Sequence, residues 1–166
     1  MNEIIISVIT FLIISVIVFL SNKYLIKRPK IKVTIQDDGA GSSASERSEY
    51  LLIKWNKFFV LNNVTNNSAY NIQFYDLPKN FIVNKNDNIN IQGFNESKIK
   101  FTFSENIEKD KVISLKHNFN KLLPSYFNEL SFGLEYNNEN NKKFYTYCNR
   151  VNSSEQNKYY IRKVYK

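Results

Sequence analysis

The feature that most constrains this chain is an uncharged apolar run near its amino terminus. The 17 residues from Ile4 to Leu20 carry no charge and include only three hydroxyl side chains. As a helix this run is about 25 Å long at 1.5 Å per residue. Ser21 and Asn22 extend it toward the roughly 30 Å of a bilayer's hydrocarbon core. We therefore predict a transmembrane helix over residues 4–22, preceded by a short tail of residues 1–3.

A cleaved signal peptide is the competing interpretation of the same run. Such a peptide has a positively charged segment before its apolar stretch and small residues before the cleavage site. Here only Glu3 and the amino terminus precede the run, and Phe19–Asn22 is a poor cleavage context. The sequence therefore favours an uncleaved signal anchor.

Basic residues are concentrated on the carboxyl side of the predicted helix. Lys23, Lys27, Arg28 and Lys30 lie in the linker of residues 23–30. The opposite flank has essentially no net positive charge, so the positive-inside rule places the amino terminus outside and the rest of the chain in the cytoplasm. We expect these four side chains to contact the anionic membrane surface.

The distribution of the charged residues along the chain is more informative than the net charge of +8. Lysine outnumbers arginine 19 to 4, which is typical of an AT-rich genome. Residues 33–140 contain 11 basic and 13 acidic side chains, so the surplus lies in the linker and in the last 26 residues. The total charge is therefore no evidence of nucleic-acid binding.

Beyond Pro29 the pattern changes to alternation of apolar and polar residues, which is typical of half-buried strands. Strong candidates cover residues 31–36, 51–61, 70–75, 98–103, 130–136, 143–148 and 158–165, and weaker ones cover 81–83, 89–92 and 111–117. A short helical turn is expected near Leu122. This many short strands predicts one all-β domain over residues 31–166, either an antiparallel β-sandwich or a small barrel.

Two segments of this body resemble a known family. The stretch from Phe58 to Ile72 is an apolar strand, a polar Asn-rich turn and a second apolar strand, and residues 130–148 form a later hairpin. Both are similar to bacterial immunoglobulin-like modules of the CARDB type. The resemblance implies an immunoglobulin-like sandwich and a role in interaction or spacing. Together with the predicted anchor, it leads us to expect a protein of the bacterial inner membrane. The disulfide of antibody domains is absent, because the chain has one cysteine.

Residues with catalytic or metal-binding chemistry are scarce. His117 and Cys148 are the only residues of their types, and neither has a partner at a recognisable spacing. We expect a surface histidine and a small buried or edge cysteine, and predict no enzyme activity, no cofactor and no metal site. Asp37 and Asp38 precede a Gly/Ser-rich stretch at 39–45, which we interpret as a mobile loop between strands.

The last residues interleave aromatic and basic side chains. Lys158, Arg162, Lys163 and Lys166 alternate here with tyrosines and aliphatic residues. The pattern favours an edge strand protected by lysines. Contact with an acidic partner or the membrane is the second interpretation, and nucleic-acid binding is the least favoured.

The sequence predicts a non-enzymatic, single-pass membrane protein whose β-sandwich is an interaction module in the cytoplasm. Its expected partners are the lipid bilayer and another protein, and the helix allows a homo-oligomer. The alternative is a ligand-sensing membrane effector that oligomerises through its helix, similar to nucleotide-responsive anti-phage effectors. A buried basic pocket distinguishes the two, and the alternation places Lys54, Lys57, Lys98 and Lys100 mostly on solvated strand faces.

Overall fold

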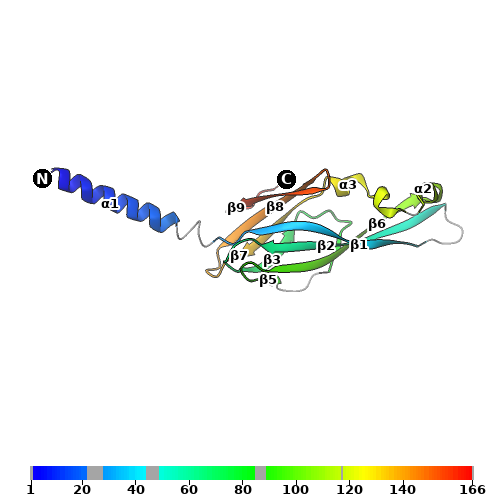
Figure 1. The fold of residues 1–166 in the computed structure, drawn as a ribbon, viewed down its shortest axis with the longest axis horizontal. Coiled ribbons are helices and arrows are strands. Elements are labelled where there is room, and N and C mark those ends of the chain that lie inside the picture. The colour runs from blue at the N-terminus through cyan, green and yellow to red at the C-terminus, as the bar shows by residue number, and fades with distance from the viewer. Residues whose placement is uncertain (1, 22–27, 44–48, 85–88, 117, 166) are drawn as a thin grey trace.

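The amino-terminal apolar run forms a helix. In the computed structural model, which describes residues 2–21, 28–43, 49–84, 89–116 and 118–165, helix α1 spans Asn2–Ser21. The apolar side chains of α1 are exposed, and within the described part of the chain it is the one helix long and apolar enough to cross a membrane. Figure 1 shows α1 joined to one end of an elongated β-body.

The body consists of two antiparallel sheets, which confirms the predicted β-sandwich. The first sheet has the order β1-β2-β6-β4, and its strands are β1 (Ile31–Ser43), β2 (Tyr50–Asn63), β6 (Glu96–Glu108) and β4 (Ile82–Val83). The second has the order β5-β3-β7-β8-β9, and its strands are β5 (Ile89–Ile91), β3 (Ala69–Tyr75), β7 (Ser131–Asn137), β8 (Lys143–Val151) and β9 (Ser154–Tyr160).

The core lies between the sheets and is strongly aromatic. Alternate residues of β2, β6 and β7 point inward, so burial in these strands follows the period of two that the sequence predicted. Phe59 of β2 stacks on Phe101 of β6 with ring centroids 3.9 Å apart, and Phe132 of β7 meets Phe59 from the opposite sheet at 4.9 Å. These rings join the two layers into one hydrophobic unit.

One edge of the sandwich is closed by a side chain. The amide of Asn157 on β9 donates from Nδ2 to the carbonyl of Val33 on β1 at 2.9 Å, and its Oδ1 accepts from the Val33 amide at 2.9 Å. This pair satisfies the amide and the carbonyl of Val33 on the edge strand β1. The carboxyl-terminal edge strand is thereby tied to the first strand of the domain.

Three sequence expectations were wrong. The stretch 39–45, predicted as a loop, continues β1 as far as Ser43, because a bulge at Gly39, with φ of +89°, lets the chain go on pairing with β2. Residues 44 and 45 lie outside the described residues. The segment predicted as a strand at 111–117 begins as helix α2 (Lys109–Ser114), which buries only Val112. The last strand is Ser154–Tyr160 rather than 158–165, because the two-residue turn Asn152–Ser153 sets its register.

The short helical turn expected near Leu122 is present as η2 (Phe119–Leu122), and α3 (Ser125–Asn128) follows it.

Candidate functional site

The outer surface of the five-stranded sheet carries a row of tyrosines. Because Phe132 and Leu134 of β7 point into the core, the residue between them faces outward. The register aligns Tyr75 of β3, Gly133 of β7 and Tyr147 of β8 across this surface. The next rung aligns Glu135, Tyr145 and Tyr160. We call Tyr75, Tyr145, Tyr147, Tyr160 and the tail residue Tyr165 the tyrosine face.

Gly133 makes room for one of these rings. A Cβ at this position would lie 1.9 Å from Cζ of Tyr75, so only glycine lets that ring lie on the sheet. The Tyr75 ring also meets Tyr145 edge to face at 6.4 Å. Burial raises the pKa of Tyr75 to about 12, so its hydroxyl stays protonated at neutral pH.

The carboxyl-terminal tail runs across the tyrosine face. After β9 ends at Tyr160, the ammonium group of Lys163 lies 4.6 Å from the ring centroid of Tyr75 and 5.2 Å from that of Tyr165. Both are cation–π distances, and they place a positive charge between two electron-rich rings. The tail is thus held on the sheet by a lysine clamp.

A groove of about 200 Å³ opens beside this clamp. Its walls come from β8, β9 and the tail, namely Tyr147, Asn149, Gln156, Lys158, Tyr160, Val164 and Tyr165. Tyrosine rings offer flat apolar surface, the two amides offer donors and acceptors, and Lys158 supplies a positive charge. The groove can therefore hold an extended chain or a planar group with acidic substituents.

The structure separates the predicted acidic-partner contacts. Lys158 lines the groove, while Lys163 is engaged by tyrosines of its own chain. Arg162 is exposed in the tail, and Lys166 lies outside the described residues. The sequence interpretation did not include Tyr75, Tyr145 and Tyr147, which the sheet brings beside Lys158. The alternation in residues 143–148 was enough to predict that Tyr145 and Tyr147 of β8 face outward. Tyr75 lies beside them only because of the strand register, which the sequence does not give.

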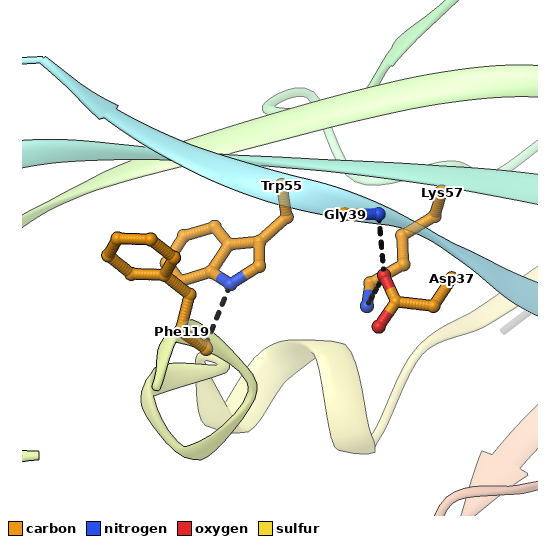
Figure 2. A network of polar contacts seen from close by, with 5 residues as sticks. All are labelled: Asp37, Gly39, Trp55, Lys57 and Phe119. Carbon is orange, nitrogen blue, oxygen red and sulfur yellow. Dashed lines mark hydrogen bonds and ion pairs between the residues drawn. The ribbon is translucent and has the colours of Figure 1, made fainter. Parts of the chain in front are cut away.

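A polar network centred on Lys57 lies on the inner side of β2. It corrects the sequence-based assignment of Lys57 to a solvated strand face. Lys57 is buried on the inner face of β2, between Trp55 and Phe59 in sequence. Its Nζ donates to Oδ1 of Asp37 at 2.9 Å, and the Gly39 amide donates to the same oxygen at 3.0 Å. Figure 2 shows both donors meeting at this carboxylate. Burial alone raises the pKa of the Asp37 carboxyl, but these hydrogen bonds outweigh it and lower the pKa below its ordinary value.

A second cation completes this network. Arg150 of β8 pairs with Glu155 of β9 through Nη1, and its guanidinium lies 4.7 Å from the ring centroid of Phe127. The Lys57 ammonium lies 5.6 Å from the same centroid. Each buried cation thus has its own carboxylate, so the network is charge-balanced.

The same network pins the chain that covers the open side of the sandwich. The indole Nε1 of Trp55 donates to the carbonyl of Phe119 at 3.0 Å, as Figure 2 shows. Phe127 of α3 is buried under the two cations. The interaction stabilises the segment from η2 to α3, and we interpret the network as structural.

The remaining chemistry is sparse. Burial raises the pKa of Cys148 to about 12, which leaves its thiol neutral, and His117 lies outside the described residues. Within the described part of the chain, no three His, Cys, Asp or Glu side chains gather as a metal site. A further hollow of about 370 Å³ lies between β6, α2 and η2, but Glu105 and Glu108 line it together with Lys111 and Lys121. This mixture of charges defines no ligand.

Of the four residues predicted to contact the membrane surface, the structure describes two. Arg28 and Lys30 lie against the body, with the guanidinium carbon of Arg28 at 5.8 Å from the Phe144 ring centroid and the Lys30 ammonium at 5.8 Å from that of Tyr159. Lys23 and Lys27 lie outside the described residues. Two of the four basic side chains are therefore fixed on β8 and β9 rather than in a free linker.

No known family model matches the chain, and no curated protein is similar to it in sequence.

Proposed function

We propose that this chain is a single-pass protein of the bacterial inner membrane that presents its β-sandwich to the cytoplasm as a non-enzymatic interaction module. Helix α1 is long enough and apolar enough to be a membrane anchor. The basic residues that follow it favour a cytoplasmic body under the positive-inside rule.

The proposal includes an immunoglobulin-like topology. In immunoglobulin constant domains one sheet has the strand order A-B-E-D and the other C-F-G. The order β1-β2-β6-β4 corresponds to A-B-E-D, and β3-β7-β8 corresponds to C-F-G, with β5 and β9 added at the two edges. Domains of this kind serve many unrelated functions, so the site must carry the functional argument.

The tyrosine face is the observation that carries the proposed function. Tyrosines provide large, rigid contact area with little loss of side-chain entropy, and they are enriched at protein interfaces. Lys158 in the groove and Lys163 in the clamp add positive charge to this surface. We infer that the partner is an acidic, extended segment of another protein.

Site-specific photocrosslinking in cells tests this surface. A photoreactive amino acid replaces Tyr147 in the groove, and a matched control replaces Lys54, which is exposed on the outer surface of the other sheet. The proposal predicts a discrete crosslinked protein at position 147 that weakens when Lys158→Glu reverses the groove charge. Equal crosslinking at both positions, or indifference to Lys158→Glu, contradicts it.

A nucleotide-responsive effector is the second candidate, and the composition of the groove favours it. Tyr147 and Tyr160 could stack on a base, Asn149 could read its edge and Lys158 could meet a phosphate. A buried basic pocket would support this candidate, but the two buried cations, Lys57 and Arg150, each have a carboxylate partner. Their charge is therefore already neutralised within the chain.

Calorimetry of the detergent-solubilised full chain against a nucleotide panel separates the two candidates. The interaction module predicts no saturable binding. Saturable binding that Lys158→Ala abolishes would replace the module with the effector.

A further inference from the structure

Two loops at one end of the body form a single rigid unit. The turn between β2 and β3 meets the turn between β5 and β6, because the Phe94 amide donates to the carbonyl of Thr65 at 2.9 Å. Fully buried Asn63 ties both turns together: its Nδ2 donates to the Asn67 carbonyl at 2.6 Å and to the Gln92 carbonyl at 3.3 Å. Such a network fixes the shape of both loops.

Apolar side chains project from this unit into solvent. Phe94 is 71% exposed and Val64 is 42% exposed. We call these two residues the proximal tip. Phe94 has φ of +58°, a strained conformation for an aromatic residue, and Gly93 lies so close to Asn66 that a Cβ would be 2.3 Å from the Asn66 carbonyl oxygen. The fold thus holds a large apolar ring outward in a strained backbone, and core packing gives no reason for it.

The proximal tip lies at the end of the body where the chain arrives from α1. The Val64 amide donates to the carbonyl of Lys30 at 3.0 Å. Seven peptide steps separate Ser21, the last residue of α1, from Arg28, so they span at most about 25 Å. In Figure 1, α2 lies at the opposite end of the body. A bilayer crossed by α1 is therefore within reach of the tip.

The charge around the tip suits an anionic surface. Residues 28–32, 62–68, 92–96 and 135–143 contain five basic and three acidic side chains, the acidic ones being Glu96, Glu135 and Glu139. Lys143 is paired with Glu135, while the ring contacts of Arg28 and Lys30 hold both cations at this end of the body. Aromatic rings flanked by basic residues are typical of the membrane–water interface.

We propose that the proximal tip rests in the headgroup region of the membrane, with Phe94 and Val64 at the acyl boundary and the exposed Lys30 on anionic lipid. This contact rests on the proposed anchor. It would fix the body on the bilayer at a second point and hold the opposite end, with α2, away from the lipid.

Fluorescence quenching in proteoliposomes tests the contact. The full chain carrying Phe94→Trp, which keeps an aromatic tip, is reconstituted into phosphatidylcholine and phosphatidylglycerol vesicles containing brominated lipid. The matched control is Ile113→Trp on α2, where the native side chain is 60% exposed at the opposite end. The one native tryptophan, Trp55, is fully buried and provides a constant background.

The proposal predicts a blue-shifted, strongly quenched emission from Phe94→Trp and no added quenching from Ile113→Trp. Equal, weak quenching of both variants in vesicles that retain the chain after carbonate washing overturns the tip contact and leaves the anchor intact. A chain that washes off the vesicles overturns the anchor together with the contact. In vesicles of phosphatidylcholine alone we expect a loss of quenching of about twofold or more, and no change would overturn the assignment of Lys30 to anionic lipid.

Discussion

Removing the carboxylate of Asp37 leaves the buried Lys57 ammonium without its ion-pair partner, and the structure sets the size of the effect. Breaking a fully buried pair costs about 3–5 kcal/mol, whereas a fully exposed pair is worth about 0–1 kcal/mol. The Lys57 side chain is 5% exposed, but that of Asp37 is 45% exposed, so water can replace the carboxylate on one side. We therefore expect Asp37→Ala to lower the free energy of unfolding by about 1–2 kcal/mol.

The matched variant is Lys57→Met, which removes the buried charge and keeps most of the apolar volume. Replacing a buried ion by a hydrophobic group is often neutral or stabilising, so this variant should lie within about 1 kcal/mol of the wild type. In the Lys57→Met background, Asp37→Ala should lose at least half of its effect, because only hydrogen bonds from the neutral donors Gly39 and Asn120 remain to be broken.

Urea unfolding of the full chain in mild detergent, followed by Trp55 fluorescence, measures these differences, since the indole belongs to the same network. The native pKa of Asp37 lies below its ordinary value of 3.8, so its stabilisation is complete above that pH and disappears as the pH falls through the native pKa. The gap between wild type and Asp37→Ala should therefore close in acid. A Lys57→Met variant less stable than Asp37→Ala would refute this reasoning.

Three further predictions concern the sheet that carries the tyrosine face. Gly133→Ala should destabilise the body by about 1–3 kcal/mol through its clash with Tyr75, and the loss should shrink in a Tyr75→Ala background; equal losses in both backgrounds, measured by urea unfolding, would contradict this. Cys148 should resist alkylation at pH 8 until the chain unfolds, and because its pKa rises from 9.0 to about 12 on folding, stability should fall as the pH rises above 9; fast labelling of the native chain would exclude this. Asn157→Ala removes both hydrogen bonds to Val33 and should cost about 1–3 kcal/mol in thermal unfolding, whereas an unchanged Tm would show that the edge closure adds nothing.

The sequence predicted the strands whose burial alternates. Phe132, Leu134 and Tyr136 in β7 all point inward as their spacing indicates. The last strand was misplaced because alternation at 158–165 outweighed a weaker local signal. Asn152 and Ser153 both have positive φ, which is the geometry of a two-residue hairpin turn, and this turn pairs a polar strand with β8.

The candidate site was harder to predict from the sequence than the strands were. Lys158 was identified as a contact residue, but Tyr75 joins it only because β3, β7 and β8 align in register. Lys57 follows Trp55 by two residues, so alternation places both on the same face of the strand, yet the charge of Lys57 suggested that it faces solvent. Its burial depends on Asp37, which lies opposite in β1, and pairing between strands cannot be read from either segment alone.

Protease accessibility of a carboxyl-terminal epitope tag tests the central claim most directly. Intact spheroplasts and lysed cells are treated in parallel, with a cytoplasmic and a periplasmic marker as controls. The proposal predicts that the tag stays with the membrane fraction and is protected until lysis, because the positive-inside rule places the body in the cytoplasm. Digestion in intact spheroplasts would contradict this account, since the tyrosine face would then meet the cell envelope instead of a cytoplasmic partner.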